Sequence, residues 1–313
     1  MEDVMAYRFK PGDEGVQDGV RRIARREVTR AIEEIDDEDL DGSRTVHQVR
    51  KRMKKVRGLL RLVRPALTGY GDKNAFFRDA AKDLSRARDA AALVESFEDL
   101  KRRVGKGGMA PYRGLRQKLL GRARRVRNDT DIAGKLETFR DRMEEASRRI
   151  DGWHLDERGF DAIEGGLKRT LKAARRGMKC SASHPDDGQL HEWRKRVKDH
   201  WYHTRLLCGI WPEAMAAREH DMKLLSDLLG DDHNLAVFRN TLRDESDTLA
   251  RSIDLDRFCA LVEEHRLDLQ AKAQAVGRRV LAEKPGALAA RWRGYWDAWH
   301  TAGTPEILAQ AAE

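Results

Sequence analysis

The stretch His47-Gln48-Val49-Arg50-Lys51-Arg52-Met53-Lys54 returns 144 residues later as His191-Glu192-Trp193-Arg194-Lys195-Arg196-Val197-Lys198. Each copy places a histidine, a basic triplet and a further lysine at the same spacing. Two flanking matches keep nearly the same offset: 19–23 aligns with 166–170 at 147, and 84–90 aligns with 229–235 at 145. Three pairs of matching segments with a nearly constant offset indicate two copies of one unit. We predict repeats over 6–151 and 152–300, followed by a tail over 301–313.

Around the first copy, apolar residues recur at the period of a helix. Val49, Met53, Val56, Leu60 and Val63 fall on one face at about 3.6 residues per turn. Alternating strand patterns are absent. The sequence therefore predicts an all-α fold, with two helical bundles related by a pseudo-two-fold axis. The same periodicity marks 15–35, 74–101, 130–150, 159–179, 188–208, 214–250, 255–283 and 287–299.

Composition narrows the class of protein. The chain has 313 residues, of which 40% are hydrophobic and 37% charged, with a net charge of +9. Periodic apolar residues argue against disorder, and no stretch approaches the roughly 20 apolar residues of a spanning helix. No signal peptide is visible, and the three cysteines are scattered, so we expect reduced thiols in a cytoplasmic protein. The excess of positive charge points to an anionic partner.

The charge is concentrated on particular helix faces. From 44 to 64 there are nine Lys and Arg and no acid, although a solvated helix normally mixes both signs. A histidine opens the basic face in both copies and can donate to phosphate oxygens. These two faces are the predicted centre of an anion-binding site. Its candidate residues are His47, Arg50, Lys51, Lys54, Arg57 and Arg61, with His191, Arg194, Lys195, Lys198, Tyr202 and Arg205.

Flanking basic runs extend the predicted site, while acids gather elsewhere, with seven of them in 33–41. For any single run, a solvated surface is the simpler interpretation, but the duplicated motif favours ligand binding. The flanking candidates are Arg22, Arg26, Arg88, Arg113, Arg116, Lys168, Arg169, Lys172, Arg175 and Arg176.

Other kinds of site lack support. His200 and His203 have helical spacing, but no carboxylate or cysteine set completes a metal site. No nucleophile motif, phosphate-binding glycine loop or dinucleotide fingerprint occurs. We therefore predict no catalytic residue, no metal and no cofactor.

In their order and spacing these motifs resemble the CHAD family, the conserved-histidine α-helical domain. The resemblance spans roughly 6–300. It implies two four-helix bundles with a basic central groove or cavity, binding of inorganic polyphosphate, and association with polyphosphate granules. Some relatives carry a CYTH triphosphatase domain, whose strand motif is not seen here. The matching segments are 7–12, 47–57, Arg88-Asp89, 190–198, 225–230, 234–237 and 282–285.

Polyphosphate is a linear polyanion without sequence, so Lys and Arg in a groove suffice to bind it and to release its counterions. The leading alternative is a non-specific nucleic-acid binder, which would use the same basic faces. An enzyme acting on phosphates is less favoured, because hydrolysis usually needs Mg²⁺ held by carboxylates. A structural helical scaffold is the third alternative.

Overall fold

The computed structural model describes residues 7–129, 131–183, 185–251 and 253–301, without the side chains of 86–88 and 106. Apart from Thr301, the predicted tail lies outside the described residues, as does residue 6. The described residues form helices joined by turns and loops, with no strand, and their one β-bridge joins Leu67 to Leu155. The helices are α2 (Val16–Asp36), α3 (Gly42–Leu62), α4 (Tyr70–Asp83), α5 (Ser85–Gly108), α6 (Arg113–Asp129), α7 (Ile132–Ile150), α8 (Asp161–Ser183), α9 (Asp187–Leu206), α10 (Pro212–Asp244), α11 (Leu255–Val280) and α12 (Pro285–Thr301).

The all-α prediction is confirmed, with three local corrections. The segment predicted over 74–101 is two helices, because Leu84 leaves the helical conformation at φ −93° and ψ 6° while its side chain stays buried. The basic run from Arg113 forms α6, which apolar periodicity did not reveal. The segment predicted over 214–250 ends as α10 at Asp244, and a short π-helical turn follows, Ser246–Ala250.

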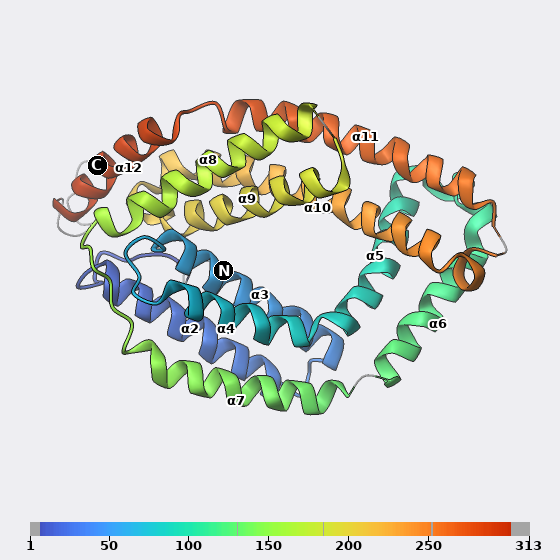
Figure 1. The fold of residues 1–313 in the computed structure, drawn as a ribbon, viewed down its shortest axis with the longest axis horizontal. Coiled ribbons are helices and arrows are strands. Elements are labelled where there is room, and N and C mark those ends of the chain that lie inside the picture. The colour runs from blue at the N-terminus through green and yellow to red at the C-terminus, as the bar shows by residue number, and fades with distance from the viewer. Residues whose placement is uncertain (1–6, 130, 184, 252, 302–313) are drawn as a thin grey trace, which may run out of the picture.

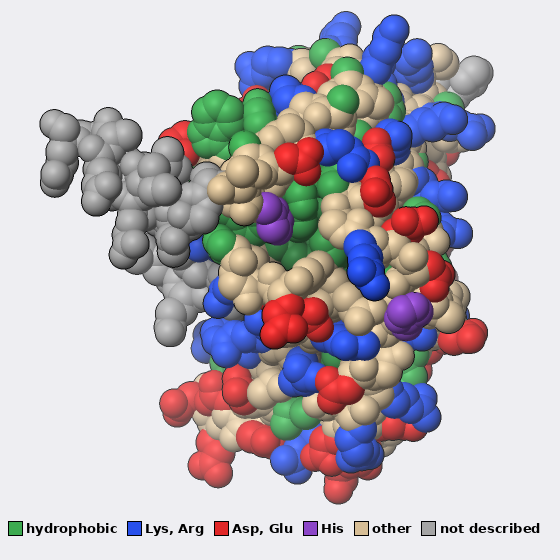
Figure 2. Space-filling model, turned by 90° about the vertical axis from the view of Figure 1, so that its left-hand side faces the viewer, with side chains coloured by type: hydrophobic (Ala, Val, Ile, Leu, Met, Phe, Trp, Pro, Cys, Tyr) green, Lys and Arg blue, Asp and Glu red, His purple; other side chains and the backbone are tan. Residues whose placement is uncertain are grey.

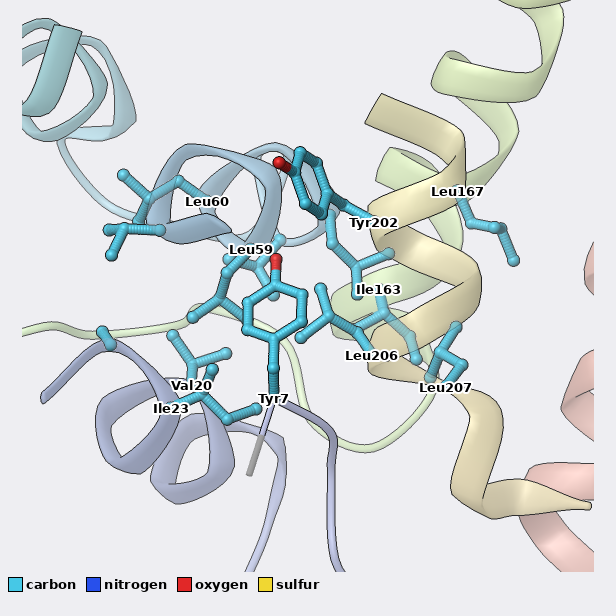
Figure 3. Close-up of a cluster of buried hydrophobic side chains, with 14 of the residues drawn as sticks. Tyr7, Val20, Ile23, Leu59, Leu60, Ile163, Leu167, Tyr202, Leu206 and Leu207 are labelled. Atoms are coloured by element: carbon cyan, nitrogen blue, oxygen red, sulfur yellow. The ribbon is translucent and has the colours of Figure 1, made fainter. Parts of the chain in front are cut away.

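The main hydrophobic core joins both halves of the chain. Tyr7 lies at its centre, with Val20 and Ile23 of α2, Leu59 of α3, Ile163 of α8 and Leu206 at the end of α9 around it (Figure 3). The Tyr7 hydroxyl donates to the Lys55 carbonyl at 2.7 Å, which satisfies its one buried polar atom. The helices that carry the repeated motif are therefore anchored in a common core.

A second core lies at the far end of the molecule and also joins both halves. Leu100 of α5 and Leu115 of α6 pack there with Phe238 of α10 and Phe258 of α11. Tyr112 stacks edge-on against Phe258, with ring centroids 4.7 Å apart. In Figure 1, α5 and α6 accordingly leave the other helices of the first half and lie against the ends of α10 and α11.

The acid-free helix α3 obtains acids from its neighbour α2. Lys55 contacts Glu27 at 3.0 Å, and both side chains are 1% exposed. Arg52 contacts the same Glu27 at 3.2 Å and Glu34 at 2.6 Å. Two of the nine basic residues between 44 and 64 thus face the protein interior. Internal carboxylates therefore balance part of the positive charge that the sequence pattern assigned to an external anion.

Candidate functional site

Both helices that open with the repeated motif begin at an aspartate cap. Asp41 accepts from the backbone N–H groups of Ser43 and Arg44 at 2.9 and 3.0 Å, and Asp186 accepts from that of Gln189 at 2.9 Å. Each cap satisfies N–H groups that have no partner within the helix. The two caps fix where α3 and α9 start, and each histidine follows within two turns.

α3 and α9 pack against each other at equivalent positions of the repeat. A Cβ on Gly58 would lie 2.9 Å from Tyr202 Cβ, so the missing side chain permits the approach. Gly58 and Tyr202 each lie eleven residues after their histidine. At 1.5 Å per residue, each histidine stands about 16 Å along its helix from the contact. The two helices separate toward those histidine-bearing ends (Figure 1).

The helix contact also holds polar groups from three helices. Arg61 of α3 contacts Asp199 of α9 at 2.7 Å. His203 is fully buried, with Nε2 3.1 Å from the Gly58 carbonyl and Nδ1 3.0 Å from the Thr170 hydroxyl. Burial lowers the pKa of His203 to about 3, so the ring is neutral at physiological pH. Arg61 is therefore engaged within the protein.

Tyr202 is a correction to the predicted site. The helical wheel places it beside His191, but the structure leaves it only 4% exposed in the main core. Its ring packs on Gly58 and meets Tyr7 edge-on, with centroids 6.0 Å apart. The wheel fails here because α3 covers this part of α9. Burial raises the pKa of the Tyr202 phenol, which stays protonated.

On α3 the candidate residues differ in exposure and partners. His47 and Lys54 are exposed, whereas Arg50 and Lys51 are half-buried. Arg50 donates to the carbonyl of Ala81 on α4. His47 lines a surface hollow of about 480 Å³ with Arg44, Gln48 and Glu95 among its other walls. Arg57 lies further along, 3.2 Å from the Asn74 side chain, and burial with nearby Arg61 lowers its pKa to about 10.

On α9 two partly buried cations, Arg194 and Lys198, have no carboxylate within ion-pair distance among the residues that the structure describes. Arg194 has a buried Nε with no hydrogen-bond partner among the described residues. Burial lowers the pKa of its guanidinium and, together with Arg194, lowers the pKa of Lys198 to about 8. Their neighbour Lys195 contacts Glu192. Desolvated cations of this kind raise the energy of the unliganded protein, and an anionic ligand would offset that cost.

His191 faces a second histidine, His233 of α10. Their Nδ1 atoms lie 3.2 Å apart and their ring centroids 4.4 Å apart. Burial, followed by Arg194 and His191, lowers the pKa of His233 to about 4. Burial, Lys195 and Arg194 also lower the pKa of His191. Both rings are therefore mainly neutral near pH 7, in a region of positive potential.

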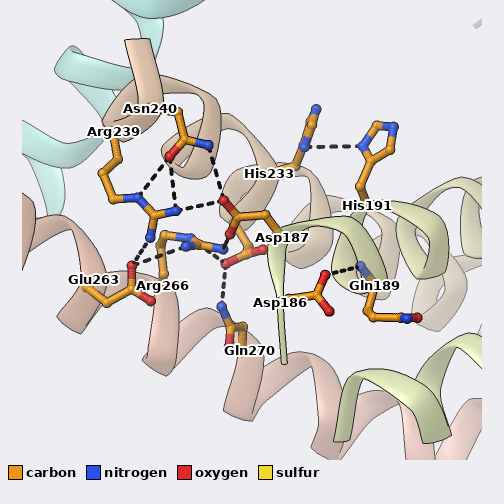
Figure 4. Close-up of polar contacts among 11 residues, drawn as sticks. Asp186, Asp187, Gln189, His191, His233, Arg239, Asn240, Glu263, Arg266 and Gln270 are labelled. Atoms are coloured by element: carbon orange, nitrogen blue, oxygen red, sulfur yellow. Dashed lines mark hydrogen bonds and ion pairs between the residues drawn. The ribbon is translucent and has the colours of Figure 1, made fainter. Parts of the chain in front are cut away.

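A partly buried network of charges fixes the start of α9 against α10 and α11 (Figure 4). Arg266, which is 2% exposed, contacts Asp187 at 2.8 Å and Asp232 at 3.0 Å. Arg239 reaches Asp187 at 2.7 Å. Burial alone would raise the pKa of Asp187, but these arginines hold it below its usual range. Since Asp232 directly precedes His233, the network positions the histidine pair.

A scan against protein-family models matches residues 22–243 to the CHAD domain. The chain belongs to the CHAD domain family. The scan finds no CYTH domain in these 313 residues. A search of the curated proteins found no match. CHAD is a helical, binding-type domain associated in general with polyphosphate.

Several other candidate cations of this CHAD protein, most of them from the flanking runs, already have protein partners. Arg22 contacts Asp13 at 2.5 Å, Lys168 contacts Glu164 at 2.7 Å, and Arg116 contacts Glu98. Arg175 donates to carbonyls at the end of α11, including that of Glu283 at 2.7 Å. Arg205 lies 3.6 Å from Glu219 and over the ring of Trp201. The exposed candidates are Arg26, Arg113, Arg169, Lys172 and Arg176.

Sequence reasoning missed His233, although the repeat contained the signal. At the offset of 145, His233 aligns with Arg88, which was itself a candidate. The Arg88 side chain lies outside the described residues. The sequence pairs Arg88-Asp89 with His233-Asn234 and predicts from this difference that the two halves need not contribute equally, but only Arg88 is among the predicted site residues.

Three other features bear on the site. Among the described residues, no cluster of three or more His, Cys, Asp or Glu could hold a metal ion. No helix in the same part of the chain combines the length and apolar character needed to cross a membrane. The face at the left of Figure 1 mixes basic and acidic side chains around a hydrophobic hollow (Figure 2). That face lacks the single sign of charge expected for polyanion binding.

Proposed function

We propose that this CHAD protein binds inorganic polyphosphate along the motif-bearing ends of α3 and α9. The observation that carries the proposal is the pair Arg194 and Lys198. Both are partly buried cations, and neither has a carboxylate within 4 Å among the described residues. His47, Arg50, Lys51 and Lys54 would complete the site from the equivalent positions of α3, with His191 and Lys195 on α9.

The repeat suits a long, regular ligand. We propose that 6–151 and 152–300 are duplicated units arranged as two pseudo-two-fold-related four-helix bundles, with the two basic faces sharing a central groove. The contact of Gly58 with its repeat equivalent Tyr202 supports this symmetry. A polyanion running across both faces would meet similar cations in each half, and arginine forks and lysine point charges would neutralise successive phosphates.

The proposed role is binding without catalysis, in the cytoplasm and at polyphosphate granules. The residues assigned to the ligand are cations and histidines, while the nearby Asp187 and Asp232 are engaged by Arg266. Carboxylates that already form ion pairs with an arginine are poorly placed to hold the Mg²⁺ that phosphoryl transfer usually needs.

Titration with long-chain polyphosphate at low and high salt tests the function. We expect the dissociation constant to rise steeply with salt, because binding releases condensed counterions. The double variant Arg50→Glu/Arg194→Glu should lose nearly all binding, whereas Arg278→Glu/Arg243→Glu, with the same change in charge on other helices, should retain most of it. Salt-insensitive binding or full retention by the first variant would contradict the proposal.

Competition separates polyphosphate from nucleic acid, which remains the alternative partner. Polyphosphate should displace single- or double-stranded DNA when both are supplied at equal total charge. Displacement only in the opposite direction would favour the nucleic-acid function.

A further inference from the structure

We propose that His191 and His233 form a proton-accepting pair within the polyphosphate site, so that binding draws protons from solution and strengthens as the pH falls. This inference rests on the proposed function and adds His233 to the binding residues. The pair lies where α9 and α10 meet, and its rings are tilted by 38° with their centroids 4.4 Å apart.

The contact between the rings sets how many protons they can hold. With Nδ1 3.2 Å from Nδ1, one ring must donate and the other must accept. The donor ring can take a proton on Nε2 from solvent without breaking this hydrogen bond. A second proton, on the accepting Nδ1, would bring two N–H groups together and separate the rings. The pair can therefore accept one proton while its hydrogen bond and its position are kept.

The surroundings keep that proton off the free protein. Arg194 and Lys195 bring positive charge to the pair, whereas the nearest acids already have basic partners. Glu192 contacts Lys195, and Asp187 contacts Arg266. The charged groups around the pair are Asp187, Glu192, Arg194 and Lys195 of α9, Asp231 and Asp232 of α10, Arg266 of α11, and Arg103 of α5, which contacts Asp231.

A polyanion reverses the sign of this potential. Phosphate oxygens beside Arg194 would cancel its repulsion of a protonated imidazole and accept a hydrogen bond from it. The pair then gains a proton as the ligand binds. In the first repeat the position aligned with His233 is Arg88, an obligate cation, so the histidine pair belongs to the second repeat alone.

Calorimetry measures the protons directly. Long-chain sodium polyphosphate is titrated into the protein at about pH 6.5, in two buffers of different ionisation enthalpy. Long chains keep the ligand's own titratable end groups few. We expect uptake of about one proton per site. We also expect the affinity to rise up to tenfold for each unit by which the pH is lowered. His233→Asn should lose that uptake, whereas His220→Asn, an exposed histidine on the same helix, should keep it.

The outcomes distinguish the two proposals. Absence of binding by the wild type overturns the proposed function itself. Binding with no dependence on buffer, or with uptake unchanged in His233→Asn, overturns only the proton-coupled pair. If His233→Asn melts far below the wild type, the ring proton resonances of His191 and His233 in the wild type give the answer instead. Unchanged titration of both rings on adding polyphosphate would contradict the inference.

Discussion

Arg194 is a residue at which the proposed binding role and the stability of the fold are expected to conflict. Its Nε is buried without a partner, and burial lowers the pKa of its guanidinium. Replacing it by an uncharged side chain of similar length removes the desolvation cost while keeping most apolar contacts. We expect Arg194→Met to raise the free energy of unfolding by about 1 kcal/mol.

The same variant should weaken polyphosphate binding at least tenfold, about 1.4 kcal/mol. Denaturant unfolding and ligand titration measure the two effects on one preparation. Arg278→Met provides the control, because Arg278 is exposed on α11 and its loss changes the net charge equally. A loss of stability in Arg194→Met would show that the guanidinium stabilises the fold.

We expect Lys198 to make binding at the proposed site depend on pH in a second range, above that of the histidine pair. Burial and Arg194 lower its pKa to about 8, below the ordinary value of about 10.4. Between these values the unfolded chain binds more protons, so this group makes stability rise with pH. Its charge is lost from the free protein over the same range, so polyphosphate affinity should fall above about pH 8.

Lys198→Arg tests this assignment, because arginine stays charged throughout. We expect binding isotherms between about pH 7 and 9.5 to show a fall in affinity for the wild type and a flatter profile for the variant. Identical profiles would exclude Lys198 as the titrating group.

At the scale of single residues, the sequence identified the basic side chains but not the protein groups that they contact. The repeat singled out Arg194 and Lys198, which the structure places on α9 as partly buried cations. It could not show that Arg175 caps the end of α11 or that Arg22 contacts Asp13, because those partners are set by tertiary packing. It also missed His233, whose importance depends on the neighbouring helix.

At the scale of elements, the contact between α3 and α9 depends on a missing side chain. A Cβ at Gly58 would lie 2.9 Å from Tyr202 Cβ, which is too close for both helices to keep their positions. We expect Gly58→Ala to lower the free energy of unfolding by about 1–3 kcal/mol through overpacking. It should also weaken polyphosphate binding, since the two basic faces would move apart.

Gly71→Ala is the matched control for that variant. Gly71 lies within α4, and a Cβ there would meet nothing within 4 Å. Alanine should therefore stabilise the helix by roughly 0.5–1 kcal/mol. Thermal or denaturant unfolding compares the two. Equal effects of both substitutions would rule out a close contact at Gly58.

Most helices could be predicted because each buries an apolar stripe with the period of its own backbone. The break at Leu84 escaped detection because one non-helical residue barely shifts that period, and Leu84 itself is buried. The sequence did not predict α6 because arginines dominate its hydrophobic pattern, and only Leu115 and Leu119 are buried in it. Periodicity reports burial and fails where few residues are buried.

At the scale of the whole molecule, the two cores do not follow the two repeats. The second core needs Leu100, Tyr112 and Leu115 from the first repeat together with Phe238 and Phe258 from the second. The main core likewise places Tyr7 and Leu59 against Ile163 and Leu206. The repeated motifs in the sequence carry no information about which half of the chain supplies each side of a core.

This interleaving predicts that neither half folds alone. Expressed separately, 1–151 would expose the apolar faces of α5 and α6, and 152–313 would expose those of α10 and α11. We expect each fragment to show low helicity or to aggregate, and the mixture to regain the circular dichroism of the intact chain. The control is the intact chain cleaved between 151 and 152 after folding, which should stay associated. A fragment that folds by itself with a cooperative thermal transition would show that the repeats are independent domains.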